Sequence, residues 1–571
     1  MPDRRQLTRP GPLACALLAL SFAVVTTLHA QPVRGIGDDA LSPARGGIRV
    51  TVGTSISDFS ERYGRNTPGR SDGSREPLGI DFTRDTLGVA QFPGLSAAQS
   101  ALRTLTGNNA FTLNLGRSAL TSSVRVQTTP IQIEAGVSRR LAIGVMIPLV
   151  SARQIGTLNV NGSAGSGTVG LNPARLATIG DSAIVTNTAL VSQLTVARNQ
   201  LAALLQQCNG NPGSNAQCPA IIANAPSINA SATAFTTGIA QVYGTTVTRS
   251  SAAPFVPFAG TGADSAIRTR VATFRAQFQQ FGITALAPGT IGPSRAVAAL
   301  TPDGFQRAAA DSSLGLFAEP LGTITRQGLG DMEVSVKLRL FDSFGFRDDS
   351  TRFLPKGMNL RQSFAGVYRF GTGTIDQTDH YLDLSTGDGQ NDVEIRSFTD
   401  VIYGRRFFGS LIARYAIQLP DEQLRRITDS PDQVFAPRYR ERLVQRDLGD
   451  QLEIEVTPRW IVSDFFSIGA QYLFRRKGKD VHEGRYDVPV SESGLAAPIT
   501  LDASTLNVET EAVEQRVGVG VTFSTVAAHA RGRAAFPIEV QYLNSRTITG
   551  SGGAVPKLSI HQVQVRLYPR L

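Results

Sequence analysis

The chain has 571 residues and a formal net charge of +10, from 56 Lys and Arg against 46 Asp and Glu. The basic residues are mostly arginines spread thinly along the chain, which argues against a nucleic-acid-binding protein. The five His and three Cys show no spacing typical of a metal site or a nucleophile–base pair. We therefore expect no metal, no other cofactor and no enzymatic activity.

The first thirty residues have the pattern of a secretory signal. Three arginines among the first nine residues precede an apolar run from Leu13 to Leu28, and Leu28-His29-Ala30 is an acceptable small-residue cleavage site. We expect residues 1–30 to be removed by cleavage near Ala30. Residues 31–46 are polar and contain Pro and Gly, so we expect them to form a periplasmic tether.

After the tether, apolar and polar side chains alternate strictly in stretches long enough for a strand. From Met332 to Leu340 every second residue is apolar, and the residues between are Glu333, Ser335, Lys337 and Arg339. A period of two places one strand face in an apolar medium and the other in a polar one. Such strands are typical of a transmembrane β-barrel, with lipid outside and water and ion pairs inside.

Twelve such strands follow one another along the chain. We expect them near residues 47–57, 122–137, 141–152, 330–342, 360–371, 391–403, 408–419, 449–461, 465–476, 510–524, 533–545 and 558–571. The odd-numbered strands end in long connections, whereas most even-numbered strands end in short turns. This alternation is typical of bacterial outer-membrane barrels, whose short turns lie in the periplasm. The predicted fold is therefore all-β, a transmembrane antiparallel up-and-down β-barrel of about twelve strands.

The barrel strands fall into two blocks separated by a large insert. Residues 47–152 contain strands one to three with a long first loop, and residues 329–571 contain strands four to twelve. Residues 153–328 are rich in small and polar residues and are predicted to be mostly helical. A further helix is expected within the first long loop, near residues 96–105. The insert is predicted to be an extracellular cap or plug.

Two stretches of the insert carry apolar residues at helical spacing. One stripe runs from Leu190 to Cys208 and the other from Ile267 to Phe281. We expect the two stripes to pack on each other as an antiparallel helical hairpin. The functional alternative is that the stripes form a gate over the lumen or a surface for a partner.

Two cysteines remain after removal of the signal, Cys208 and Cys218, and they flank a polar nine-residue stretch. In an oxidising envelope such a pair is expected to form a disulfide that closes a tight loop. No His or acidic residue lies close to them in the sequence, so a metal site with the usual number of ligands is not expected here.

The polar faces of the predicted strands carry many charges that would point into the lumen. The candidate lumen-lining residues are Glu333, Lys337, Arg339, Arg396, Glu453, Glu455, Arg459, Arg475, Glu514 and Arg516. Further charges expected on the same faces include Glu134, Arg361, Arg369, Glu394, Asp400, Arg414, Glu539 and Arg566. They are predicted to form either ion-pair ladders that fill the barrel or a charged constriction that filters solutes.

Two kinds of segment resemble a known group of outer-membrane proteins. Residues 131–150, with their short turn and the proline in GVMIPLV, resemble the early hairpin of transporter-like barrels annotated with the meta-pathway of phenol degradation. The stretches GLGDMEVSVKLRL and STGDGQNDVEIR are similar to strand openings of this group and, more remotely, of long-chain fatty-acid transporters. The resemblance covers the strands and not the insert, and it assigns no binding residue.

The resemblance implies passive uptake or export of small solutes, hydrophobic ones among them, across the outer membrane. Expected partners are outer-membrane lipid, the transported solute and, during biogenesis, periplasmic chaperones and the barrel-assembly machinery. The alternative is a surface-display or adhesion protein in which the barrel only anchors the helical insert.

Overall fold

The computed structural model describes most of the chain beyond the predicted signal. The described residues are 38–64, 71–161, 167–296, 299–314, 316–344, 357–404, 406–429, 433–493, 497–508, 510–530 and 532–569. The predicted signal peptide, its cleavage site and the first part of the predicted tether lie outside these residues.

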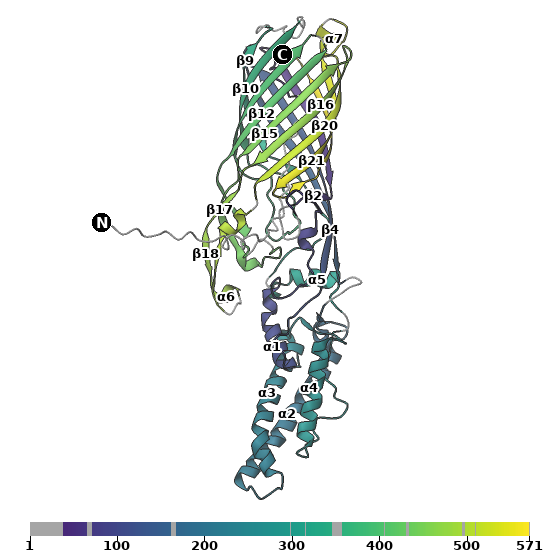
Figure 1. Ribbon diagram of the computed structural model, residues 1–571, viewed down its shortest axis with the longest axis vertical. Helices are drawn as coiled ribbons and strands as arrows, with labels where there is room; N and C mark the ends of the chain where they lie inside the picture. The colour runs from purple at the N-terminus through teal and green to yellow at the C-terminus, as the bar shows by residue number, and fades with distance from the viewer. Residues whose placement is uncertain are drawn as a thin grey trace, which may run out of the picture.

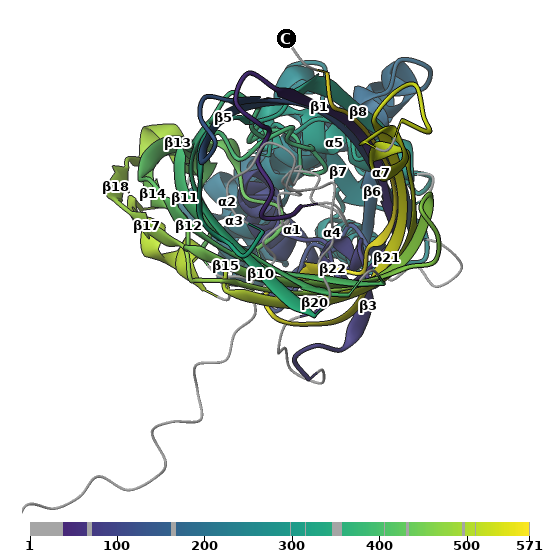
Figure 2. The ribbon, with the colours of Figure 1, turned by 90° about the horizontal axis from the view of Figure 1, so that it is seen from above.

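Twelve antiparallel strands close into a barrel, which confirms the predicted fold class (Figures 1 and 2). The barrel strands are β1 (Ile48–Phe59), β4 (Ser118–Gly136), β5 (Leu141–Val160), β9 (Met332–Asp342), β10 (Met358–Phe370), β11 (Asp392–Tyr403), β12 (Phe407–Gln418), β15 (Gln451–Ile461), β16 (Phe466–Lys477), β20 (Ala512–Ser524), β21 (Ile538–Gly552) and β23 (Ser559–Leu567). Each strand pairs with the next one in the chain, and β1 pairs with both β4 and β23, which closes the ring.

One wall is longer than the others. β9 pairs with residues 141–146 of β5 and β8 (Ile324–Leu329) with residues 149–154, so β8 and β9 act as one strand interrupted at Gly330. β5 itself runs on to Val160. The barrel sheet therefore extends into both ends of the predicted insert of residues 153–328, because alternating residues continue the strand pairing there.

The alternation of side chains explains why these segments form strands. Val336 and Val519 are 48% and 65% exposed on the outer face, whereas Glu333 and Glu455 are buried on the inner face. Exposed aromatic side chains gather near both rims of this apolar belt, with Trp460 among them. An apolar exterior with aromatic rims and a charged interior suits a barrel immersed in lipid.

The two ends of the barrel differ. The short turns lie at one end of the barrel, together with the start of β1 and the last residue of β23. We call this the short-turn end, and it is at the top of Figure 1. The opposite, long-loop end carries short elements outside the barrel strands. These are β2 (Glu61–Tyr63), β3 (Arg75–Pro77), β13 (Asp421–Arg426), β14 (Glu441–Asp447), β17 (Val481–Glu483), β18 (Arg485–Val488), β19 (Ile499–Asp502), β22 (Val555–Pro556) and α6 (Val490–Ser493). A further short helix, α7 (Val526–Ala530), lies in a turn at the short-turn end.

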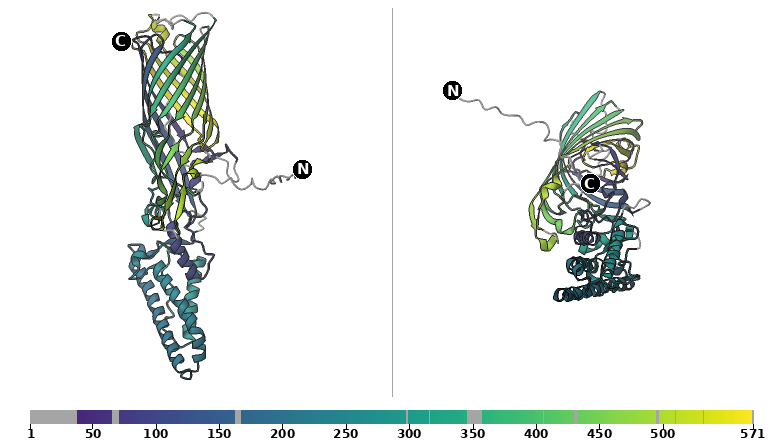
Figure 3. Two further views of the ribbon diagram at one scale, coloured as in Figure 1. Left: turned by 90° about the vertical axis from the view of Figure 1, so that its left-hand side faces the viewer. Right: turned by 60° about the horizontal axis from the view of Figure 1, so that its bottom comes forward.

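The insert forms an elongated helical bundle beyond the long-loop end (Figures 1 and 3). Its helices are α2 (Gly180–Gly210), α3 (Cys218–Tyr243), α4 (Gly262–Gln279) and α5 (Pro302–Ala310), and they are accompanied by the strand pair β6 (Val169–Leu171) and β7 (Phe255–Pro257). The helix predicted in the first long loop is present as α1 (Ser96–Thr106), and it packs on α3 and α4. No helix among the described residues has the length and apolar character required to cross a membrane.

The expected pairing of the two apolar stripes is wrong. The stripe of α2 packs along α3, a helix that was not predicted, and the stripe of α4 reaches α3 through the rings of Phe274 and Phe235, whose centroids are 5.2 Å apart. The physical reason is chain connectivity. α3 follows α2 after a tight turn, so it covers the α2 stripe before α4 can.

The predicted disulfide is present at the tip of the α2–α3 hairpin. The sulfur atoms of Cys208 and Cys218 are bonded, and both side chains are buried. The bond joins the last turn of α2 to the first turn of α3, at the end of the bundle farthest from the barrel.

Replacing both cysteines with alanine is expected to loosen the distal hairpin without opening the barrel. A disulfide that closes a loop of this size contributes about 2–4 kcal/mol by restricting the unfolded chain. Limited proteolysis should then cut the variant within residues 209–217 at protease concentrations that leave the wild type intact. Equal resistance of the two proteins would show that helix packing alone holds the tip.

Candidate functional site

The lumen near the short-turn end is occupied by a segment from the N-terminal side of β1. Lys337 Nζ donates hydrogen bonds to the carbonyl oxygens of Asp39, at 2.6 Å, and Leu41, at 3.0 Å. The amide of Ala40 donates to Asp400 Oδ2 at 2.9 Å, and its carbonyl oxygen accepts from Ser363 at 2.5 Å. We call residues 38–42 the lumen segment.

The lumen segment also supplies acidic side chains to buried arginines. Asp38 Oδ2 lies 2.8 Å from Arg414 Nη2, and Asp39 Oδ1 lies 3.3 Å from Arg49 Nη1. Arg566 lies 3.9 Å from both carboxylates. The expectation of a periplasmic tether over residues 31–46 is therefore wrong for these residues. They lie inside the barrel and add carboxylates to arginines that also pair with glutamates of the strands, Arg49 with Glu134 and Arg414 with Glu453 and Glu455.

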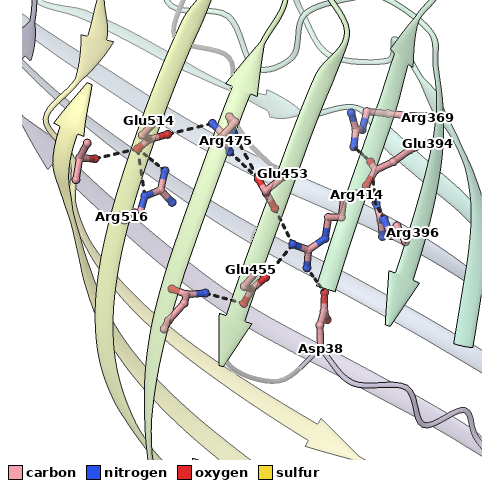
Figure 4. A network of polar contacts seen from close by, with 12 residues as sticks. Asp38, Arg369, Glu394, Arg396, Arg414, Glu453, Glu455, Arg475, Glu514 and Arg516 are labelled. Atoms are coloured by element: carbon pink, nitrogen blue, oxygen red, sulfur yellow. Dashed lines mark hydrogen bonds and ion pairs between the residues drawn. The ribbon is translucent and has the colours of Figure 1, made fainter. Parts of the chain in front are cut away.

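A second group of charges lies on the neighbouring strands β12, β15 and β16 and contacts this segment through Arg414 (Figure 4). Arg414 Nη1 lies 2.6 Å from Glu453 Oε1 and 2.8 Å from Glu455 Oε2, and its side chain is only 1% exposed. Glu455 also accepts from Gln471 Nε2 at 2.8 Å. Arg414, on β12, thus links two glutamates of the neighbouring strand β15 to Asp38 of the lumen segment.

The network continues around the wall through shared carboxylates. Arg475 on β16 lies 3.2 Å from Glu453 and 3.4 Å from Glu514, and Arg516 lies 2.8 Å from Glu514. Glu453 and Glu514 are each shared by two guanidinium groups, and these pairings compensate the free-energy cost of removing the charges from water.

A third group lies on β9, β10 and β11. Arg369 contacts Glu333, Asp392 and Glu394 at 2.8, 2.6 and 2.9 Å. Arg396 lies 2.7 Å from Glu333 and 2.8 Å from Glu394. Glu333 and Glu394 therefore each bind two arginines, and Figure 4 shows Glu394 between Arg369 and Arg396.

The structure places the ten predicted lumen candidates on the inner face in separate groups. Glu453, Glu455, Arg475, Glu514 and Arg516 belong to the network around Arg414, whereas Glu333 and Arg396 belong to the Arg369 group. Lys337 holds the lumen segment. Arg339 pairs with Asp342 at 3.0 Å near the short-turn end, and the guanidinium of Arg459 lies 5.4 Å from the ring of Phe408.

Sequence reasoning missed several charged residues of the lumen, among them Arg49, Asp342, Asp392, Asp38 and Asp39. Arg49 takes the inward position between Ile48 and Val50, so the alternation of β1 contained the signal that identifies it. Asp38 and Asp39 precede the first strand and have no periodic pattern, and no sequence signal places them inside the barrel.

A cavity of about 480 Å³ lies between these charge networks and the long-loop end. Its polar lining contains as many acidic as basic side chains, and most of them are paired with each other. Its apolar lining includes Phe59, Val126, Leu473, Leu558 and Ile560. The cavity therefore offers an apolar surface beside polar groups without an excess of either charge.

Loops from distant parts of the chain cover the cavity. Arg426 on β13 is buried and donates to the carbonyl oxygens of Leu316 and Ala436, at 2.8 and 3.0 Å, and of Phe317, at 3.0 Å. Tyr381 also donates to Ala436 O, at 2.8 Å, and burial raises the pKa of this phenol to about 12, so the donor keeps its proton. We call the loops joined by Arg426 the cover.

His482 on β17 lines the same cavity. Burial lowers the pKa of His482 on β17 below its ordinary value, although a side-chain hydrogen bond with Asn507, at 3.1 Å, opposes the shift. His482 is therefore neutral near pH 7. Among the described residues, no group of three or more His, Cys, Asp or Glu side chains is arranged to hold a metal ion.

Comparison with known proteins gives neighbours of low similarity. No protein-family model matches the chain, and no curated protein matches it. An outer membrane channel from Pseudomonas putida F1 superimposes with a TM-score of 0.39 at 9% identity, over 94% of this chain and 100% of that one. The Pseudomonas putida toluene transporter TodX gives 0.24 at 7% identity, over 96% and 100%. The assignment of the fold rests on the strand pairing of this chain itself.

Proposed function

We propose that this protein is an outer-membrane channel through which small solutes, hydrophobic ones among them, pass by diffusion. The observation that carries the proposal is the cavity inside a closed barrel whose outer face is apolar. A barrel of this size is wider than one filled by side chains alone. The lumen segment and the cover then stand at the two ends of a path along the barrel axis.

The location follows from the same features. A backbone whose groups all pair within a closed ring can cross a membrane without exposing unpaired polar groups. The short turns are proposed to lie in the periplasm and the helical bundle outside the cell, as in bacterial outer-membrane barrels. Export would precede insertion, with periplasmic chaperones and the barrel-assembly machinery as partners.

The cavity lining favours neutral solutes over ions. Acidic and basic side chains are balanced around it, so a charged solute would gain no net attraction and would lose hydration on entry. Apolar side chains such as Leu473 and Ile560 offer contact area to a solute with an apolar body. The paired charges would meet the polar groups of that solute.

The channel proposal is tested with purified protein in planar bilayers and in liposomes. We expect stepwise conductance that falls with falling salt concentration, and swelling of liposomes in neutral solutes of a size that fits the cavity. Deletion of the bundle at residues 180–286, bridged by a short flexible linker, should change the step size, because the cover contacts the base of the insert through Leu316 and Phe317.

A second function is favoured by one observation, the disulfide-closed tip of the bundle, which lies far from the barrel (Figure 3). A rigid projection of this kind suits a surface-display or adhesion protein. Silence in bilayers and liposomes, together with a cell-binding phenotype that is lost when the bundle is removed, would replace the channel proposal with this one.

A further inference from the structure

One part of the barrel exterior is polar where the rest is apolar. It lies on β21, β23, β1, β4 and β5, toward the long-loop end. Ser545 and Ile560 line the cavity. Because side chains alternate between the faces of a strand, their neighbours Arg546 and Ser559 face outward.

Directly paired positions form rows across these five strands. The basic row consists of Arg546, Ser559, Asp58, Arg125 and Arg153. Two residues nearer the short-turn end, the amide row consists of Asn544, His561, Ile56, Gln127 and Ser151. Four residues further, the apolar row consists of Val540, Val565, Val52, Ile131 and Ile147. The exterior thus changes from apolar to uncharged polar to basic along the strands.

The basic row contains three arginines but a single carboxylate, that of Asp58. Arg125 pairs with Asp58 at 2.6 Å, and Arg153 lies directly opposite Arg125 on β5. Like charges at directly opposite positions destabilise a sheet. Within the described parts of the chain, no ion pair is formed by Arg153 or by Arg546, and both side chains are exposed. Arg125 therefore has a carboxylate partner, and the guanidinium groups of Arg153 and Arg546 have no ion-pair partner among the described residues.

The adjoining part of the wall, at β16, shows that this row is not a general property of the rim. Arg476 on β16 also points outward at the long-loop end, but its cross-strand neighbours are Leu452 and Val513. Tyr472, four residues nearer the short-turn end, is an exposed aromatic residue of the rim. Arg476 is thus an isolated cation on an apolar wall and serves as a matched control.

We propose that the basic row binds the phosphates of a bisphosphorylated, acylated sugar lipid in the leaflet around the long-loop end. The inference rests on the proposed outer-membrane location. Arg546 and Arg153 are separated by four strand spacings, about 19 Å, which exceeds the width of a headgroup with a single phosphate. Guanidinium groups bind phosphate through paired, charge-assisted hydrogen bonds.

The amide row and the apolar row, which lie nearer the short-turn end, fit the rest of such a lipid. Asn544, His561 and Gln127, which hydrogen-bond to neighbours on the wall, form an uncharged polar surface at the depth where the amide and ester carbonyls of the lipid would lie. The apolar row then contacts the acyl chains. The order of the rows along the wall therefore matches the order of groups along the lipid, from phosphate to linkage to chain.

The test measures lipid affinity by native mass spectrometry of the full-length mature protein in a neutral detergent, titrated with diphosphoryl lipid A. The double variant Arg153→Gln/Arg546→Gln should bind about thirtyfold more weakly than the wild type, and each single variant about fivefold more weakly. Arg476→Gln should bind as the wild type does. Monophosphoryl lipid A and phosphatidylglycerol should both bind more weakly than the diphosphoryl form.

Three results would overturn the proposal: equal affinity of the double variant and the wild type, an equal loss in Arg476→Gln, or equal binding of diphosphoryl lipid A and phosphatidylglycerol. A heat-modifiable band on unboiled gels confirms that each variant is folded. Because the basic row lies outside the lumen, the double variant should keep wild-type conductance in phosphatidylcholine bilayers. Lipid affinity therefore tests the lipid proposal, and conductance tests the channel proposal separately.

Discussion

Removal of the lumen segment is expected to raise the single-channel conductance severalfold. A mature chain that lacks residues 31–42 loses the carbonyl oxygens that bind Lys337 and the carboxylates that bind Arg414 and Arg49. The cross-section near the short-turn end would then be filled by wall side chains alone, and water would enter. Planar bilayer recordings of the deletion variant and the wild type at the same salt concentration measure the change.

Two further variants separate a blocked path from a change of charge. Asp38→Ala/Asp39→Ala keeps the backbone of the segment but removes its ion pairs, so an intermediate conductance with frequent fluctuations is expected. Asp181→Ala removes an acidic residue from the bundle, where its partner is Arg249, and should leave the conductance unchanged. A deletion variant with wild-type conductance would show that the segment does not obstruct the path.

Replacement of Arg414 with leucine is expected to destabilise the barrel more than any exposed charge substitution. Arg414 is buried and binds Glu453, Glu455 and Asp38. Without it, carboxylates stay in the lumen without their shared cation, and breaking a buried pair in this way costs about 3–5 kcal/mol. The folded band in a heat-modifiability gel should disappear at a clearly lower temperature than in the wild type.

The matched control is Arg485→Leu. Arg485 lies 3.1 Å from Asp502, but its side chain is 80% exposed, so the pair is screened by water and its loss should leave the transition temperature unchanged. Arg414→Lys retains one positive charge and should fall between the two. A transition temperature for Arg414→Leu equal to that of the wild type would mean that water already solvates these glutamates.

The barrel could be predicted from the sequence because each strand carries its own signal. In β9, the alternation from Met332 to Leu340 specifies both the strand and its outward face without any knowledge of its neighbours. The turn between β4 and β5 is equally local. The inward direction of Glu333 and Lys337 followed from the same period, and only their partners depended on the fold.

Helix α3 was not predicted because its buried face mixes large apolar residues with alanines and its sequence contains a proline. Ile221, Ala225, Ile228, Ala232 and Phe235 recur at helical spacing, but alanines and an internal proline weaken the contrast with the exposed face. The lumen segment was missed for a different reason. Its position depends on cations from β1, β9 and β12, which lie far away in the sequence and meet only in the closed barrel.

The pairing of β1 with β23 has a consequence for biogenesis. Val52 on β1 pairs with Val565 on β23, which is synthesised more than five hundred residues later. The ring therefore keeps a free edge until β23 has been made. Until then the first strand exposes unpaired backbone groups along one side, which invite pairing with other chains. Folding is therefore expected to wait for the end of synthesis. A truncation before residue 559 should yield an insoluble product rather than a smaller pore.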